Sequence, residues 1–170
     1  FRSTDNGKSW LQLSSGLSDA DIDYVATARD GYVFALSHSS PPPWPSGVDG
    51  IFRSDDNGEN WIFIGGQSGY WLVSNSFGDL FLSNGGLYRS TDLGDSWVYL
   101  SNNGLPASTL VRCLAIDLDG HLFVGTYDGV YYSADNGDNW TRINKGLTLI
   151  SDDIQCIAVN SKNALFAGTG

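Results

Sequence analysis

The sequence has no methionine and only two cysteines among its 170 residues. Cys113 and Cys156 are too few for a disulfide framework or a cysteine-rich metal site, and we interpret both as thiols of the core. No apolar run approaches the roughly 20 residues that cross a membrane, and no signal-peptide pattern begins the chain. Because there is no initiating methionine, we expect a processed product or part of a longer protein.

Basic residues are also scarce: 9 Lys and Arg stand against 19 acidic residues, and the formal charge is −10. This balance argues against nucleic acid and anionic membranes as partners, because both are bound through clusters of Lys and Arg. Glu59 is the only glutamate, so the other 18 acids are Asp. Asp and the 21 glycines favour turns, whereas Glu favours helices. The composition therefore predicts a β protein with many tight turns.

The frame S-x-D-x-G-x-x-W occurs four times, in "RSTDNGKSW", "RSDDNGENW", "RSTDLGDSW" and "YSADNGDNW". Four fixed residue types in eight positions, found four times, indicate a structural repeat. The residues of the frame are Ser3, Asp5, Gly7, Trp10; Ser54, Asp56, Gly58, Trp61; Ser90, Asp92, Gly94, Trp97; and Ser133, Asp135, Gly137, Trp140.

Each copy of the frame lies between two short β-like runs, such as "GIFRS" before it and "WIFIG" after it. We therefore expect a hairpin in which the Asp bonds local backbone amides, the Gly takes a positive φ and the Trp begins the return strand. Two further strands with a polar turn between them precede the hairpin, as in "RCLAIDLDGHLFVGT". Four antiparallel strands in roughly 40 residues are the period of a β-propeller blade.

The order of the strands, named a to d in each blade, predicts two half blades. A c–d hairpin occupies 1–16, whole blades occupy about 17–65, 66–103 and 104–146, and an a–b pair occupies 147–170. The two halves together make one more blade. The sequence therefore predicts an all-β chain of propeller blades: an arc of a larger propeller of roughly six to eight blades, a ring that closes on itself, or a ring of two copies.

The frame resembles the Asp-box, or BNR repeat, of the sialidase-like β-propeller superfamily, and the resemblance covers nearly the whole chain. The running pattern with "CIAVN", "LFAGT" and "GVYYSADNGDNW" is most similar to secreted bacterial Asp-box repeat proteins of uncharacterised function. In this superfamily the box is a structural hairpin at the blade periphery, so the resemblance assigns the four boxes to folding. A feature repeated in every blade also cannot define one asymmetric active site.

Two enzyme classes of the superfamily suggest active sites. Sialidases grip the substrate carboxylate with three Arg, but Arg2, Arg53 and Arg89 share one strand position before their boxes, so we do not expect them to converge. Xyloglucan hydrolases place an Asp in the b–c loop, and Asp128 in "GTYDGVYYS" is the matching residue. No second matching Asp is evident for a carboxylate pair. Asp128 is therefore the single catalytic candidate, and an Asp-Gly turn is the competing interpretation.

Some box sequences, such as "DDNGEN", bear a faint likeness to calcium loops. An EF-hand loop needs more oxygen ligands and a distal bidentate Glu, and Glu59 is at the wrong spacing. His38 and His121 are expected in loops on opposite faces, so a shared metal site is not expected. We predict no metal and no cofactor.

Ligand contacts are expected on the face opposite the boxes, where the d–a and b–c loops emerge. The insertion "SHSSPPPWPSGVDG" lengthens one b–c loop, and its prolines display Trp44 on a stiff segment that suits stacking on a sugar ring or a peptide. The alternative is that Trp44 packs on its own blade. Tyr127 and Asp128 occupy another b–c loop.

One early position of strand a is polar in every blade, and the next position is aromatic or sulfur-containing. Alternation along a strand directs the polar set to the channel and the other set between the sheets. We expect the polar set either to contact a ligand at the channel mouth or to face water in the channel. It consists of Asp23, Tyr70, Arg112 and Gln155.

The leading hypothesis is a non-enzymatic scaffold, extracellular, at the cell surface or in the periplasm, that binds a glycan or a protein on the face opposite the boxes. The alternative is a segment of a glycoside hydrolase propeller, sialidase-like or xyloglucanase-like, and a third hypothesis is an intracellular assembly factor. A further partner is expected to complete the ring: the rest of its own parent chain or a second copy.

Overall fold

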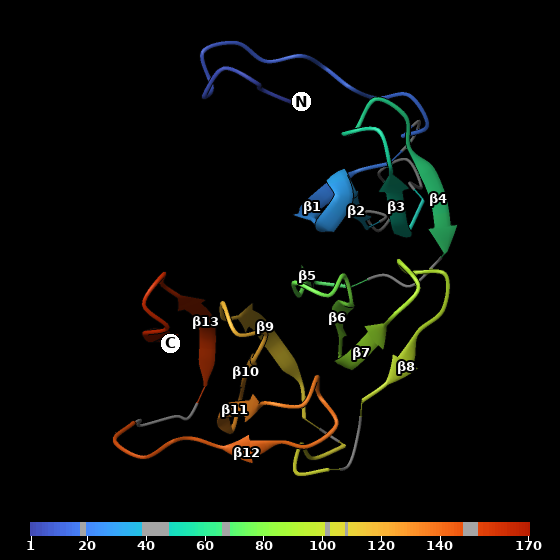
Figure 1. Ribbon diagram of the computed structural model, residues 1–170. Helices are drawn as coiled ribbons and strands as arrows, with labels where there is room; N and C mark the ends of the chain where they lie inside the picture. Colours follow the sequence, from blue (N-terminus) through green and yellow to red (C-terminus); the bar gives the residue numbers. More distant parts are fainter. Residues whose placement is uncertain (18–19, 39–47, 66–68, 101–102, 108, 148–152) are drawn as a thin grey trace. The chain divides into compact units, whose positions relative to one another are not determined.

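The structure, a computed structural model, describes residues 1–17, 20–38, 48–65, 69–100, 103–107, 109–147 and 153–170. Nearly all regular structure in these residues is β-strand (Figure 1). The elements are β1 (Ile22–Thr27), η1 (Arg29–Gly31), β2 (Val33–Ser37), β3 (Gly50–Ser54), β4 (Ile62–Gly65), β5 (Trp71–Ser74), β6 (Leu80–Asn84), β7 (Gly86–Ser90), β8 (Val98–Tyr99), β9 (Val111–Ile116), β10 (Leu122–Thr126), β11 (Gly129–Ser133), β12 (Thr141–Arg142), β13 (Ile154–Val159) and β14 (Leu165–Thr169). Among the described residues, no helix has the length and apolar character needed to cross a membrane.

The strands form three four-stranded antiparallel sheets, β1–β4, β5–β8 and β9–β12, and the two-stranded sheet β13–β14. Strands that follow one another along the chain are neighbours in each sheet, so each sheet is a meander. The chain divides into two compact units, Phe1–Ser68 and Gly69–Gly170. The first holds β1–β4 and an N-terminal hairpin in which Arg2 pairs with Leu11, and the second holds the other three sheets. The predicted all-β class with four-stranded antiparallel units is confirmed.

The second and third strands pair with the same register in every four-stranded sheet. A buried Phe of the second strand lies opposite the residue that precedes the box Ser. Because a one-residue slip would turn this Phe to the other face, burial of the Phe fixes the register. The pairs are Phe34–Arg53, Phe81–Arg89 and Phe123–Tyr132.

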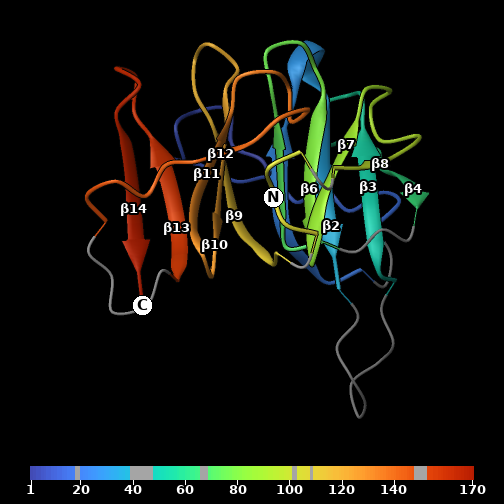
Figure 2. The ribbon, with the colours of Figure 1, turned by 90° about the horizontal axis from the view of Figure 1, so that it is seen from below.

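The core of the second unit lies between consecutive sheets, which Figure 2 shows side by side. Phe81 and the partly buried Trp71 and Val73 belong to a cluster with Leu114 and Leu122 that joins β5–β8 to β9–β12. A second cluster joins β9–β12 to β13–β14 and contains Cys113, Val130 and Ile154. Face-to-face packing of successive four-stranded sheets is the arrangement of propeller blades.

The two cysteines differ in their surroundings. Cys113 is buried in the second cluster, and burial raises the pKa of its thiol to about 11. Cys156 is exposed, so the interpretation that both are core thiols is wrong for this residue. It belongs to the face of β13–β14 that the described residues leave uncovered, where Phe166 is 59% exposed although the equivalent Phe81 is fully buried.

The box forms the same hydrogen-bonded hairpin in all four repeats. In the third box the Ser90 hydroxyl donates to Asp92 at 2.7 Å and accepts the Gly94 amide at 2.8 Å, and Asp92 also accepts the Ser96 amide at 2.9 Å. Gly94 has φ +91°, and the residue before it, Leu93, is also left-handed at φ +58°. In this hairpin the Ser and Asp side chains bond the turn and the Gly has a positive φ, and the left-handed residue before the Gly is an addition to the sequence expectation.

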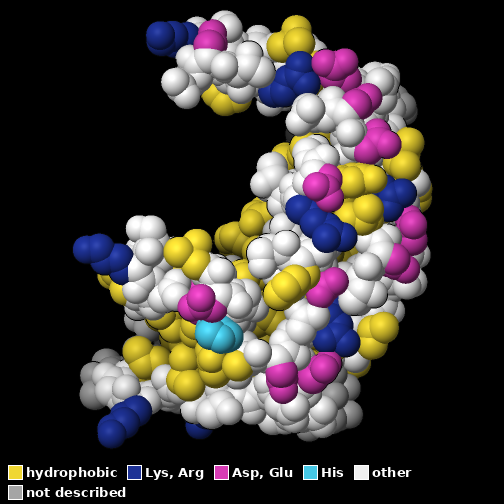
Figure 3. Space-filling model, viewed as in Figure 1, with side chains coloured by type: hydrophobic (Ala, Val, Ile, Leu, Met, Phe, Trp, Pro, Cys, Tyr) yellow, Lys and Arg dark blue, Asp and Glu magenta, His cyan; other side chains and the backbone are white. Residues whose placement is uncertain are grey.

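Arg89, which precedes the third box, joins its blade to the next one. Its guanidinium donates to the Asn136 carbonyl at 2.7 Å and to the Asp138 carboxylate at 2.9 Å, both in the fourth box. Figure 3 shows Lys and Arg side chains beside Asp and Glu side chains on the visible face. This position therefore serves contacts between blades, which explains why an Arg recurs there without a substrate carboxylate.

The same contact recurs in the first unit but is replaced at the fourth box. Arg2 donates to the Asn57 carbonyl at 2.9 Å and to Glu59 at 3.2 Å. Tyr132, at the corresponding position of the fourth box, instead packs against the ring of Phe123, with centroids 5.3 Å apart and ring planes tilted by 46°.

The loop between two sheets makes a second contact with the following box. The Trp140 amide donates to the Asn103 carbonyl at 2.6 Å, and Gly104 follows with φ +94°. A Cβ on Gly104 would collide with the Trp140 carbonyl, so only glycine fits. Gly16 stands in the same relation to Trp61.

The turn between the first two strands is an Asx turn in the second unit. Asp117 accepts the backbone amides of Asp119 at 3.0 Å and His121 at 2.8 Å. Asn75 and Asn160 accept the equivalent pair of amides in β5–β6 and β13–β14. The turn therefore needs a side-chain oxygen at this position, and an amide supplies it as well as a carboxylate does.

Replacing Asp92 with Ala is expected to lower the free energy of unfolding by about 1 kcal/mol, because the Ser96 amide and the Ser90 hydroxyl lose their acceptor. Urea denaturation followed by tryptophan fluorescence measures the change. Thr91→Ala, an exposed neighbour in the same box, serves as the control. Equal stability of the two variants would contradict the role of the Asp.

The box carboxylates also predict a loss of stability in acid. Hydrogen bonds from Asn60, first its amide and then its side chain, and from Ser54 lower the pKa of Asp56 from 3.8 to about 2. A carboxyl whose pKa is lowered by folding stabilises fully above pH 3.8, and this contribution is lost as the pH falls toward 2. The urea midpoint should therefore decrease between pH 4 and pH 2. Asp56→Asn should flatten the decrease, and Asp55→Asn should not.

The Asx turn predicts different outcomes for two substitutions of Asp117. Asp117→Asn should change the free energy of unfolding by less than about 0.5 kcal/mol, because Asn fills the same position at Asn75 and Asn160. Asp117→Ala should lower it by about 1–2 kcal/mol, since two amides lose their acceptor beside a side chain that is only 5% exposed. Equal losses for both variants, measured by urea denaturation, would show that the charge rather than the turn matters.

Candidate functional site

A pocket of about 430 Å³ opens in the second unit at the end of the sheets away from the boxes. It lies where β5 and β9 begin and where β6 and β10 end, because antiparallel strands bring these ends together. Its lining residues are Tyr70, Trp71, Asn84, Gly85, Leu110, Val111, Arg112 and Tyr127.

Arg112, one of the lining residues, is held in position by a network of polar side chains. Its guanidinium donates to Asp153 at 3.2 Å and to Gln155 at 2.5 Å, and the Gln155 amide donates to Asp153 at 2.6 Å. The guanidinium carbon also lies 4.7 Å from the centroid of the Tyr127 ring, within cation–π distance. The Arg charge is thus neutralised by Asp153, and the Tyr127 ring is held in place.

The rim of the pocket presents aromatic rings to solvent. Tyr70 is 65% exposed and Tyr127 is 54% exposed, and Leu110 of the same lining is a further exposed apolar side chain. Tyr127 and Leu110 also line an adjoining hollow of about 280 Å³ that includes Asp128. The two hollows thus share Leu110 and Tyr127 in their linings.

Asp128 is engaged in its own turn. One carboxylate oxygen accepts the Tyr131 hydroxyl at 2.7 Å, and the other accepts the Arg142 guanidinium at 2.8 Å. Desolvation and then the bond to Asp128 raise the pKa of Tyr131 to about 12. The Asp128 amide donates to the Thr126 hydroxyl at 3.0 Å, which completes the turn. These contacts hold the Asp128 side chain within its own turn.

The predicted ligand residues are only partly brought together. The pocket is lined by Tyr70, Arg112 and Tyr127. Gln155 accepts a hydrogen bond from Arg112, and Asp128 lines the adjoining hollow. Asp23 belongs to the first unit, where its carboxylate is hydrogen-bonded to Nδ1 of His38 at 2.7 Å. Trp44 lies outside the described residues.

Sequence reasoning missed two side chains of the pocket, Leu110 and Asn84. Leu110 precedes β9, where no strand pattern has yet begun, and Asn84 ends β6 as a single polar residue after the buried "LFLS". Trp71 occupies the strand position next to the polar set; it packs in part between the sheets, as expected for that position, and it also lines the pocket.

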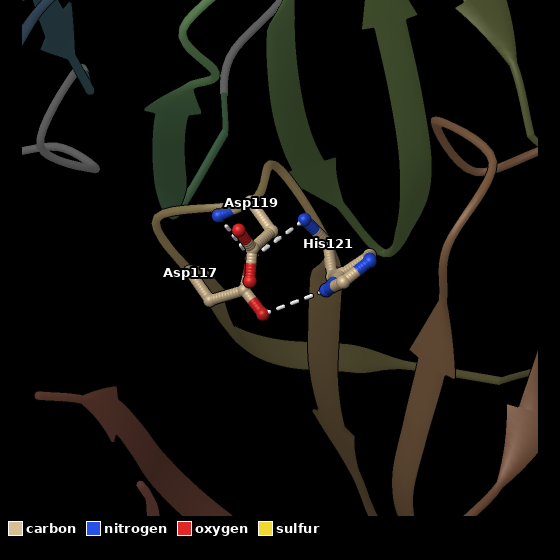
Figure 4. Close-up of side chains that lie close together, drawn as sticks. All are labelled: Asp117, Asp119 and His121. Atoms are coloured by element: carbon tan, nitrogen blue, oxygen red, sulfur yellow. Dashed lines mark hydrogen bonds and ion pairs between the residues drawn. The ribbon is translucent and has the colours of Figure 1, made fainter. Parts of the chain in front are cut away.

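A cluster of Asp117, Asp119 and His121 lies at the opposite end of the same sheet (Figure 4). Each side chain offers one ligand atom within 4.8 Å of the others. His121 Nδ1 is 2.8 Å from Asp117, and the remaining oxygen of Asp117 accepts the turn amides. The Asx turn accounts for this grouping, since the same turn forms around Asn75 and Asn160 without a metal-binding set.

The family model for the BNR/Asp-box repeat matches residues 131–142, the fourth box. No curated protein matches the sequence. Similar solved structures include the GH74 xyloglucanase from Xanthomonas campestris, with 18% identity and a TM-score of 0.63 over 90% of this chain and 28% of that one. YCF48 bound to D1 peptide gives 17% identity and a TM-score of 0.65, covering 97% and 52% of the two chains.

A putative gluconolactonase structure gives 14% identity and a TM-score of 0.66 over 99% of this chain and 63% of that one. The chain thus spans less than two thirds of each of these proteins, and the similarity concerns the fold. Four boxes with one hydrogen-bond pattern, the family-model match and the propeller neighbours agree. The chain therefore carries a BNR/Asp-box repeat at residues 131–142, and its sheets have the fold of β-propeller blades.

Proposed function

We propose that this chain is a non-enzymatic binding protein whose pocket around Tyr70, Arg112 and Tyr127 holds a carbohydrate. The observation that carries the proposal is the pair of exposed tyrosine rings at the rim of a pocket of about 430 Å³. Sugar rings present apolar C–H faces that stack on aromatic rings, while their hydroxyls need polar groups at the edge.

The polar groups of the pocket suit a neutral sugar. Arg112 is paired with Asp153, so the site offers hydrogen-bond donors and acceptors but little net charge. Asn84 adds an amide that donates and accepts. An anionic ligand would have to displace Asp153 from Arg112, at the cost of leaving that carboxylate without its partner.

Hydrolase chemistry has less support. A glycosidase needs two carboxyl groups that flank the scissile bond. Among the described residues that line the two hollows, Asp128 is the only carboxylate, and both of its oxygens are engaged by Tyr131 and Arg142.

An exported or cell-surface location fits this role. The similar structures include the extracellular domain of BT4673 from B. thetaiotaomicron, with 14% identity and a TM-score of 0.61. The acidic charge of −10 is compatible with a ligand that is not a nucleic acid.

Titration of the protein with cellohexaose and with a xyloglucan oligosaccharide, followed by isothermal calorimetry, tests the proposal. Tyr127→Ala should weaken binding by about tenfold or more, because it removes a stacking ring that Arg112 holds in place. Phe77→Ala, an exposed aromatic residue outside the pocket, should leave the affinity unchanged. Unchanged affinity of the Tyr127 variant, or release of new reducing ends from the sugars, would contradict a non-enzymatic carbohydrate site here.

A further inference from the structure

Two exposed apolar surfaces of this chain correspond, residue by residue, to the two faces that pack against each other between β5–β8 and β9–β12. The first is the uncovered face of β13–β14, where Cys156 and Phe166 are exposed. The second is a groove of about 420 Å³ in the first unit, between the N-terminal hairpin and the sheet β1–β2. Its apolar lining includes Phe1, Trp10, Val25, Val33, Ala35 and Trp61.

The joint between β5–β8 and β9–β12 shows what such a groove normally receives. There Trp71, Val73 and Phe81, from the first two strands of one sheet, join a cluster with Leu114 and Val124 of the next sheet.

The strand registers give the corresponding residues at the open surfaces. Cys156, Ala158 and Phe166 occupy the positions of Trp71, Val73 and Phe81. Val25 and Ala35 occupy the positions of Leu114 and Val124. Val25 is 57% exposed although Leu114 is buried, so the groove lacks the pair of strands that covers its equivalent.

We propose that β13–β14 of one copy of this chain inserts into the groove of a second copy, and that its β14 pairs with the N-terminal hairpin to complete a four-stranded blade. The register follows from the complete sheets, where the Phe of the second strand pairs with the residue before the box Ser. Phe166 then lies opposite Arg2, and Leu165 lies opposite Ser3. Both strand edges, which are otherwise open, gain backbone hydrogen bonds.

The loop after β12 has the backbone conformation that packs against a box Trp elsewhere in the chain. Gly146 has φ +91°, close to the φ of +87° and +94° at Gly16 and Gly104, but no atom of the described chain lies within 4 Å of its Cβ position. The other two glycines abut the carbonyl of a box Trp. Trp10 is the box Trp of the N-terminal hairpin and is 64% exposed, so it fits the vacant position beside Gly146.

The polar contacts of the joint are matched as well. Arg89 reaches an acid, Asp138, that follows the Gly of the next box, and Arg2 reaches Glu59 in the same way. At the proposed joint the Arg is replaced by Tyr132, and the acid after the box Gly is replaced by Lys8. If position 132 held an Arg, as in the other boxes, it would face the like charge of Lys8 across the proposed joint. Tyr132 avoids this repulsion, so the loss of the Arg and the loss of the acid fit each other when the two positions are neighbours.

A second copy is the occupant we favour, because both sides of the joint belong to this chain and their residues match: Gly146 with Trp10, and Tyr132 with Lys8. When two chains exchange β13–β14 reciprocally, each joint of one chain is filled by the other chain, and a dimer is the product that we propose.

The mass of the 170-residue chain in solution, measured by light scattering after size exclusion, tests the proposal. We expect twice the chain mass of 18.4 kDa, falling to one chain on dilution. Phe166→Asp should give the mass of one chain with an unchanged circular dichroism spectrum, because it places a charge in the apolar groove. Phe77→Asp alters an equally exposed Phe outside the joint and should remain a dimer.

Charge variants test the register itself. Tyr132→Arg should raise the dimer dissociation constant, and adding Lys8→Glu should lower it again by about two- to fivefold. Any of three results would overturn the proposal: a single-chain mass up to about 200 µM, a stable dimer of the Phe166→Asp variant, or equal dissociation constants for Tyr132→Arg with and without Lys8→Glu. The first of these would point to the same chain, or to a different segment, as the occupant.

Discussion

The hydrogen-bonded box hairpin is the interaction on which the rest of this structure depends. Ser90 and Asp92 close the turn from within, and the two left-handed residues, Leu93 and Gly94, direct it back along the sheet. The carbonyl exposed by this turn in the next box, that of Asn136, is the acceptor that Arg89 needs. One local motif thus stabilises its own hairpin and also provides the surface by which a neighbouring blade is aligned.

The residues that stabilise the fold and the residues that line the pocket lie at opposite ends of the sheets. The boxes, and in the second unit the Asx turns, lie at one end of the sheets and repeat with little change. The other end carries the loops in which the repeats differ, and the pocket around Tyr70, Arg112 and Tyr127 lies there. The Asp153 carboxylate that neutralises Arg112 directly precedes β13, so the site depends on the packing of successive sheets.

The open surfaces follow from the same geometry. A propeller blade buries its apolar residues only when another blade covers each face, so a sheet without a neighbour exposes residues that are core elsewhere. Phe166 and Phe81 have the same position and opposite exposure for this reason. The backbone shows the same difference: Gly104 and Gly146 are both left-handed, but only Gly104 has the carbonyl of a box Trp beside it among the described residues.

The sequence by itself determined the repeat, the four strands of each unit and the turn chemistry, because these depend on residue type and spacing within about ten positions. It also indicated that Arg112 and Gln155 share a strand position. Only the tertiary structure decided that they are bonded to each other, that Leu110 and Asn84 join the pocket and that Cys156 is exposed. Those outcomes depend on which blades face each other, and contacts between distant segments leave no periodic signal in the sequence.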